Sequence, residues 1–224
     1  MISYGEMKRY VEEAEKSNNE RIHTAMRAHL DRAIATRRKI KQLGSVNTTF
    51  IAGVREPVSL AVSLLFEQGL NYGEDNVALS TDQVQQFIEN SEKIRWINIL
   101  ELDRWFDENL LSITGHDVLG ETFPGDKGYK LYRGRGGDLC VYRLENFDSI
   151  LGALGDLIEI PSICLELKKE NIATEKAYAE KYREVLSGIS FSDSFIDKIY
   201  RTRYATHFYS PAEIEKFKAR WSNK

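Results

Sequence analysis

The segment around Arg55 constrains the fold of this chain more than any other. A β-branched, apolar run from Thr48 to Val54 stops at Arg55, and Pro57 then opens a run of apolar residues at helical spacing. Proline suits the first turn of a helix, because the N–H that it lacks would have no partner there. The pattern predicts a buried strand from Thr48 to Val54 that feeds a helix over residues 57–70.

Arg55 is thereby placed at the carboxyl end of the strand, the edge where open α/β sheets bind ligands. A guanidinium makes bidentate bonds to phosphate or sulfate oxygens, and Ser59 and Ser63 add hydroxyls on one helix face near its positive end. These residues predict an anion site. The alternative is that Arg55 pairs with a carboxylate, while the serines cap the helix or face water.

The remaining elements follow from apolar periodicity and from capping signals. Leu139–Leu144 reads as a second core strand of the parallel type, and Tyr129–Tyr132 as one arm of a short hairpin. Ser80 with Gln83, and Ser210 with Pro211 and Glu213, mark helix starts. We expect helices over residues 4–18, 21–43, 93–113, 146–158, 173–187, 192–200 and 211–221, and a loop over 71–79.

Composition indicates one α/β domain over residues 1–224, with a helical lead-in at 1–45 and the core and C-terminal helices at 46–224. The net charge of −3 gives no general attraction to nucleic acid. With neither an apolar run of membrane-span length nor a signal peptide, we expect a cytoplasmic protein. Cys140, Cys164 and the four histidines lack ligand spacing, so no metal is expected.

Arg55-x-Pro57, with Ser63 eight residues after the arginine, resembles the 3′-phosphate-binding element of the sulfotransferases that use 3′-phosphoadenosine 5′-phosphosulfate (PAPS). The chain is also similar to one branch of that superfamily, the putative capsular polysaccharide synthesis proteins. The likeness spans roughly residues 48–221, and its segments are Val54–Pro57, Trp105–Asp107, Gly115–Val118, Tyr142–Phe147 and His207–Ser210, running to Trp221.

This resemblance implies a P-loop sulfotransferase-like fold with three layers, mostly helical, built on a truncated parallel sheet. It implies transfer of a sulfuryl group from PAPS to a hydroxyl or amine, with a saccharide of a capsular or surface polysaccharide as the expected acceptor. Arg55 and Ser63 would hold the 3′-phosphate of the donor. The resemblance implies no metal cofactor for this reaction.

The chain departs from that family at the phosphosulfate-binding loop. Such a sulfotransferase begins with a strand and a loop containing Lys and Gly-Ser or Gly-Thr, whereas only helical patterns precede Thr48. Residues 120–127 come nearest, but Pro124 and Asp126 interrupt them, and residues 134–137 read as a turn. The resemblance therefore implies an enzyme only if the missing loop is supplied.

No residue matches the catalytic base or the leaving-group lysine by motif. His116 and His207 are the histidines nearest the family-like segments, but a packed or hydrogen-bonded histidine is the commoner case for both. Arg203, Tyr204 and Tyr209 either border the ligands or pin the tail to the core. The catalytic residues are left unassigned.

Three hypotheses remain open. The first is a sulfotransferase, or the larger part of one, whose first strand and loop were lost from the sequence by a misplaced start or are supplied by another chain. The second is a non-catalytic module that keeps the 3′-phosphate pocket. The third is a structural or partner-binding protein in which Arg55 is an internal ion-pair residue. A truncated sheet also exposes an edge, which predicts covering by the N-terminal helices or self-association through that edge.

Overall fold

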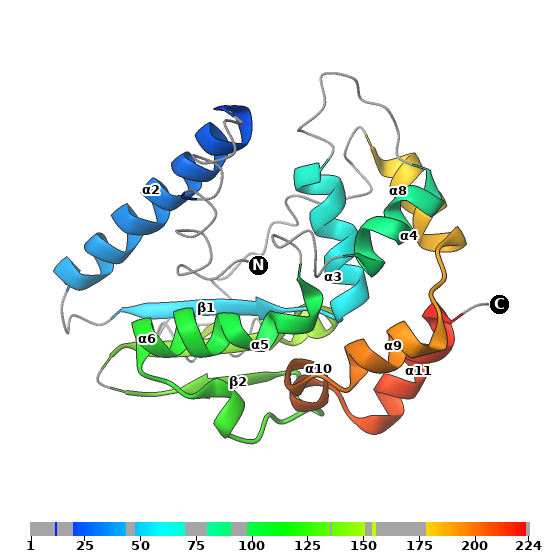
Figure 1. The fold of residues 1–224 in the computed structure, drawn as a ribbon. Coiled ribbons are helices and arrows are strands. Elements are labelled where there is room, and N and C mark those ends of the chain that lie inside the picture. The colour runs from blue at the N-terminus through cyan, green and yellow to red at the C-terminus, as the bar shows by residue number, and fades with distance from the viewer. Residues whose placement is uncertain are drawn as a thin grey trace.

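The sheet that carries Arg55 has three strands in the part of the chain that the structure describes. This computed structural model describes residues 12, 20–43, 48–69, 80–90, 98–134, 136–150, 154–155 and 178–222. Strand β1 (Thr49–Val54) lies parallel to β3 (Asp138–Arg143), and β2 (Tyr129–Tyr132) lies antiparallel to β3. The order is β1-β3-β2, so β3 is central (Figure 1).

The expected parallel pairing is confirmed for β1 and β3. Strand β2 is antiparallel to β3, which agrees with the hairpin expected at Tyr129–Tyr132 and makes the sheet mixed, not purely parallel. The short connection between β2 and β3 is the reason, because a parallel pair needs a long crossover. Gly137 closes this connection with φ at 111°, and its N–H donates to the Gly134 carbonyl at 3.2 Å. A Cβ at Gly137 would lie 2.5 Å from the Thr48 carbonyl oxygen, so the turn requires glycine there.

Helices make up most of the described residues. Their bounds are α2 (Glu20–Leu43), α3 (Pro57–Leu64) continued by the π turn η1 (Leu65–Gly69), α4 (Thr81–Glu89), η4 (Ile99–Glu101), α5 (Leu102–Trp105), the π turn η5 (Phe106–Leu110), α6 (Leu111–Thr114), η6 (Val118–Gly120), η7 (Leu144–Ser149), α8 (Ala179–Gly188), α9 (Asp193–Tyr200), α10 (Arg203–Phe208) and α11 (Pro211–Trp221). None of the helices in the described ranges is both long and apolar enough to cross a membrane.

The capping signals are confirmed where the structure describes them. Pro57 opens α3, and capping boxes start α4 at Ser80 and α11 at Ser210. Helix α10 was not expected; Thr202 caps it by accepting from the Ala205 N–H at 3.2 Å. The helix expected over 4–18, apart from Glu12, and the loop expected over 71–79 lie outside the described residues.

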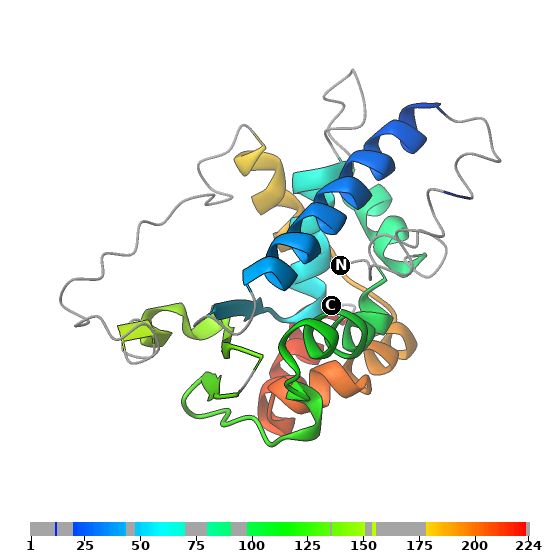
Figure 2. The ribbon, with the colours of Figure 1, turned by 90° about the vertical axis from the view of Figure 1, so that its left-hand side faces the viewer.

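The two faces of the sheet are covered unequally. Ala52, Val54, Leu139 and Val141 point into the main core, which also contains side chains of α3, α5 and the C-terminal helices. On the opposite face the buried Cys140 contacts a small cluster around Ile150. Figure 2 shows η7 on one side of the sheet and α9, α10 and α11 gathered on the other.

Helix α2 contacts the rest of the protein through a polar bond. The Arg37 guanidinium donates to the Asn109 side-chain oxygen in η5 at 3.0 Å. Figure 1 shows α2 lying across from β1, on the side of the strand that faces away from β3 in the sheet order. Ile51 of β1 nevertheless remains 54% exposed, so the described residues do not fully cover this strand.

Candidate anion site at the carboxyl end of β1

The turn between β1 and α3 lies at an edge where two parallel strands end together. Val54 pairs with Arg143, so Arg55 and Leu144 follow at the same edge. Glu56 comes next and Pro57 opens α3. This is the place in a parallel α/β arrangement where loops are available to hold a ligand.

Glu56 caps α3 from a buried position. Its carboxylate accepts from the backbone N–H groups of Val58 at 2.9 Å and Ser59 at 2.8 Å, and from the Ser59 hydroxyl at 2.6 Å. Tyr200 in α9 donates its hydroxyl to the same carboxylate. An anionic side chain at a helix N-terminus is favoured because the first N–H groups lack intrahelical partners.

This cap changes the expected roles of the two serines. The Ser59 hydroxyl is used inside the turn, contrary to the expectation that it would face an anion. The Ser63 side chain lies one turn further along α3, is partly exposed, and has no hydrogen-bond partner in the described part of the chain. The prediction that Ser63 contacts an anion therefore stays a prediction.

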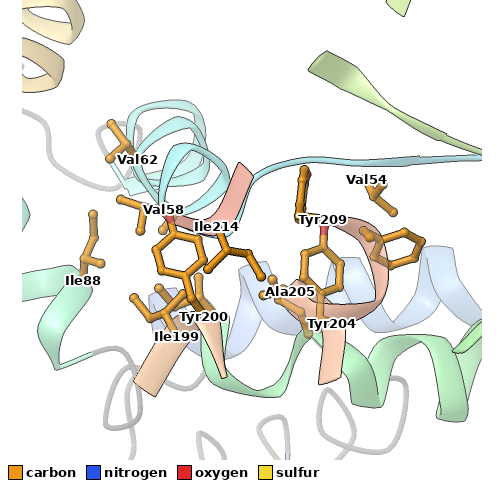
Figure 3. Packing of buried hydrophobic residues seen from close by; sticks show 14 of the residues in the cluster. Val54, Val58, Val62, Ile88, Ile199, Tyr200, Tyr204, Ala205, Tyr209 and Ile214 are labelled. Carbon is orange, nitrogen blue, oxygen red and sulfur yellow. The ribbon is translucent and has the colours of Figure 1, made fainter. Parts of the chain in front are cut away.

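Tyr204 holds the backbone of Arg55 on both sides. Its hydroxyl accepts from the Arg55 N–H at 3.0 Å and donates to the Arg55 carbonyl at 2.8 Å. Next to it the Glu56 N–H donates to the Glu145 carboxylate at 2.7 Å, and Tyr209 donates its hydroxyl to the other Glu145 oxygen at 3.1 Å. Figure 3 shows the three tyrosines 200, 204 and 209 below the junction of β1 and α3.

The tyrosine hydroxyls of this turn are held in their protonated form. Burial raises the pKa of Tyr200, Tyr204 and Tyr209, and the negative charges of Glu56 and Glu145 add to the effect in at least two of them. A hydrogen bond with the Arg55 backbone opposes the rise for Tyr204 without cancelling it. All three hydroxyls therefore remain donors through neutral pH.

The Arg55 side chain has no counter-charge among the residues that the structure describes. It is half-buried, its guanidinium donates to the Tyr182 hydroxyl at a long 3.4 Å, and no carboxylate of the described residues lies within ion-pair distance of it. The alternative in which Arg55 is an internal ion-pair residue finds no partner here. An arginine in this setting offers most of its five N–H donors to a ligand.

Arg143, at the end of the neighbouring strand, is buried, with 3% of its surface exposed. Its guanidinium bonds the Glu213 carboxylate at 2.8 Å, the Asn146 side chain at 2.8 Å, and the carbonyls of Gly125 at 2.8 Å and Phe208 at 3.2 Å. These bonds use four of the five N–H donors of Arg143 and tie β3 to the C-terminal helices, so this side chain is engaged in holding the fold together.

Neither histidine candidate contacts the turn through a described bond. The His116 Nε2 atom lies 2.9 Å from the Gly137 carbonyl oxygen, near the β2–β3 connection. The His207 Nε2 atom is buried and has no partner among the described residues, and burial, followed by Arg203 and Lys130, lowers the pKa of this histidine. Arg203 itself pairs with Asp107 at 3.0 Å.

Sequence reasoning assigned no role to the two carboxylates or to the Tyr200 hydroxyl that help to build this turn. Glu56 precedes Pro57 directly, and an acidic residue before a helix-opening proline is a signal that was available. Glu145 and Tyr204 had no such signal, because they lie 89 and 149 positions from the backbone groups that they bond. Tyr204 and Tyr209 are buried and pin the tail to the core, one of the two alternatives expected for them.

A family model matches residues 64–210, about two thirds of the chain, and its description is "Putative capsular polysaccharide synthesis protein". The matched range contains Glu145 and the three tyrosines that bond the turn, and it begins one residue after Ser63. No curated protein and no solved structure matches the chain.

Proposed function

The chain belongs to the "Putative capsular polysaccharide synthesis protein" family, and on that premise we propose that it is a sulfotransferase-like protein that uses PAPS. The sulfuryl group would pass to a hydroxyl or amine, with a saccharide of a capsular or surface polysaccharide as acceptor. We also propose a P-loop sulfotransferase-like fold. The parallel pairing of β1 with β3 supports this part of the proposal, because that fold contains a parallel sheet.

The observation that carries this proposal is that the charge of Arg55 has no carboxylate partner within the described ranges. A half-buried guanidinium without a carboxylate partner in the described residues has lost part of its hydration and gained no counter-charge. A phosphate oxygen pair would supply both the charge and the bidentate geometry. Ser63, with its hydroxyl unengaged in the described part of the chain, is the second residue that we propose for the 3′-phosphate.

The N-terminus of α3 does not belong to the proposed phosphate site. The Glu56 carboxylate already accepts from the N–H groups of Val58 and Ser59, so an anion would have to displace it. The site therefore rests on side chains, above all on Arg55. This chain's part in the reaction would be to bind and orient the donor, because sulfuryl transfer resembles phosphoryl transfer in needing positioning and charge stabilisation.

Binding of 3′-phosphoadenosine 5′-phosphate is the direct test. Isothermal titration and the thermal midpoint should report binding of this nucleotide, with weaker binding of adenosine 5′-phosphate, which lacks the 3′-phosphate. Ligand at about one hundred times its dissociation constant adds about 2.7 kcal/mol to stability. The Arg55→Ala variant should lose about 10- to 100-fold in affinity, since hydrogen bonds to a charged group contribute about 1.5–3 kcal/mol.

Arg201→Ala is the matched control, because Arg201 carries the same charge on a side chain that is 78% exposed. It should bind both nucleotides as the wild type does. Equal affinity of the wild type for the two nucleotides, or an unchanged affinity in Arg55→Ala, would overturn the donor site.

A non-catalytic binding module is the remaining alternative, and turnover separates it from an enzyme. Release of 3′-phosphoadenosine 5′-phosphate from PAPS in the presence of capsular saccharide acceptors would support transfer. Arg55-dependent binding without release would favour the binding module.

A further inference from the structure

The Tyr204 hydroxyl makes two hydrogen bonds to the backbone of Arg55. A tyrosine hydroxyl has one donor and two acceptor lone pairs, and here it satisfies both peptide groups of a single residue, the N–H at 3.0 Å and the carbonyl at 2.8 Å. Arg55 lies between the last residue of β1 and the N-cap of α3, so neither element supplies these bonds.

The position of the Tyr204 hydroxyl is fixed by its ring. Tyr204 is 1% exposed, and its ring packs against Phe106 and Phe208 with centroid distances of 5.9 Å and 5.1 Å. Both partners belong to the main core, which Figure 3 shows around Tyr204. A rigid ring therefore holds the Arg55 backbone in one conformation, which sets the direction in which the side chain leaves the turn.

The other tyrosines of the turn act on different groups. Tyr200 bonds the carboxylate of Glu56 and Tyr209 bonds that of Glu145, so both act on the cap and on its neighbour. Tyr204 bonds the backbone of the arginine itself. Of these three hydroxyls, the one on Tyr204 is the most direct constraint on the guanidinium.

We propose that Tyr204 is a positioning residue of the anion site, whose hydroxyl presets the Arg55 backbone so that the guanidinium binds a phosphate without first being ordered. This inference rests on the proposed function and adds the residue that controls its site. Preorganisation raises affinity because less conformational freedom is lost when the ligand binds. Removing the hydroxyl should therefore weaken binding of the 3′-phosphate specifically.

The test is Tyr204→Phe, which keeps the ring and removes the hydroxyl. Affinity for 3′-phosphoadenosine 5′-phosphate should fall about 3- to 10-fold, the range that one neutral hydrogen bond represents. Affinity for adenosine 5′-phosphate should stay unchanged. In the Arg55→Ala background the same substitution should have no further effect on binding, since positioning needs the residue that is positioned.

Tyr132→Phe is the matched control, because the Tyr132 hydroxyl is buried and has no hydrogen-bond partner among the described residues. It removes the same atom from another buried tyrosine and should leave both affinities unchanged. All titrations are made well below the thermal midpoint of each variant, so that a loss of stability does not count as a loss of affinity.

Hydrogen exchange of the wild-type protein gives a readout that needs neither ligand nor variant. The Arg55 amide lies outside the hydrogen-bonded bodies of β1 and α3, yet it should be protected because it donates to Tyr204. Rapid exchange at this amide would overturn the inference.

The binding outcomes separate the inference from the function beneath it. A wild type that does not distinguish the two nucleotides overturns the proposed function. A wild type that does distinguish them, together with a Tyr204→Phe variant that binds equally well or loses affinity for both nucleotides alike, overturns the positioning role alone. A loss that persists in the Arg55→Ala background also overturns it.

Discussion

Arg55 and Arg143 leave the same edge of the sheet from neighbouring parallel strands, and the protein engages them in opposite ways. Arg143 is buried and bonds one carboxylate, one amide and two carbonyls. Arg55 is half-buried, and a long bond to the Tyr182 hydroxyl is its described side-chain contact. The difference teaches that the partners of a strand-end arginine indicate its role, whereas its position at the edge of the sheet does not.

The C-terminal helices create this difference. They bring Glu213 and the Phe208 carbonyl to the guanidinium of Arg143, but they bring the Tyr204 hydroxyl to the backbone of Arg55. The same block of helices therefore pairs the charge of Arg143, whereas the half-buried guanidinium of Arg55 has no carboxylate partner in the described residues. This contrast supports the proposal that Arg55 binds a ligand while Arg143 holds the fold together.

Arg143→Ala should break the comparison most strongly. It leaves the Gly125 and Phe208 carbonyls without a donor and the Glu213 carboxylate without its cation. We expect a loss of about 3 kcal/mol in the free energy of unfolding, as for one partner removed from a buried charged network. Urea unfolding measures it, and a loss no larger than that of Arg201→Ala would contradict the structural role.

Glu56→Ala should have the next largest effect. The substitution removes a buried acceptor of four hydrogen bonds and the N-cap of α3. We expect a loss of about 2 kcal/mol in unfolding free energy, against about 1 kcal/mol for Ser80→Ala at the exposed cap of α4. If Glu56→Ala and Ser80→Ala lower the free energy of unfolding by the same amount, the burial of Glu56 does not strengthen its contribution as a cap.

Alkaline pH should weaken the turn through its tyrosines. In the folded protein, burial raises the pKa values of Tyr200, Tyr204 and Tyr209. In the unfolded chain, tyrosine side chains have a pKa of about 10. Their contribution is therefore full below about pH 10 and is lost as the pH rises from there towards the folded pKa values. The free energy of unfolding should fall by about 1.4 kcal/mol per pH unit for each such tyrosine in that range.

Urea midpoints measured on both sides of that pH test this expectation. Cys140 contributes in the same direction, since burial raises the pKa of its thiol to about 11. Tyr204→Phe should show a shallower fall than the wild type because it has one titrating group fewer. If the free energy of unfolding of the wild type stays constant above about pH 10, the pKa values of these hydroxyls are not raised in the folded protein.

Arg55→Ala should have the smallest effect on stability. Because the guanidinium has no carboxylate partner in the described part of the chain, we expect a change within about 0.5 kcal/mol, as for Arg201→Ala. Thermal and urea unfolding of the two variants provide the measurement. A cost comparable with that of Arg143→Ala would erase the contrast between the two arginines and favour the structural alternative for Arg55.

Local signals predicted the elements around the site well. The strand ending at Val54, the helix opened by Pro57, the parallel partner strand and the capping boxes at Ser80 and Ser210 are all confirmed. Each depends on residues within a few positions of one another, which is the range over which apolar periodicity and capping act. Helix α10 was not predicted, because it is short and Thr202, its N-cap, is followed neither by a proline nor by a glutamate or glutamine three residues later.

The sequence by itself determined that an arginine ends a core strand directly before a helix, because the apolar run and Pro57 leave little other choice. Only the tertiary structure decided that this arginine has no ion pair with the described residues while Arg143 has one. The physical reason is distance along the chain: the groups that make the decision, Tyr204 and Glu213, lie 149 and 70 positions from the residues that they bond. Their approach depends on how the C-terminal helices pack against the core, which no local pattern specifies.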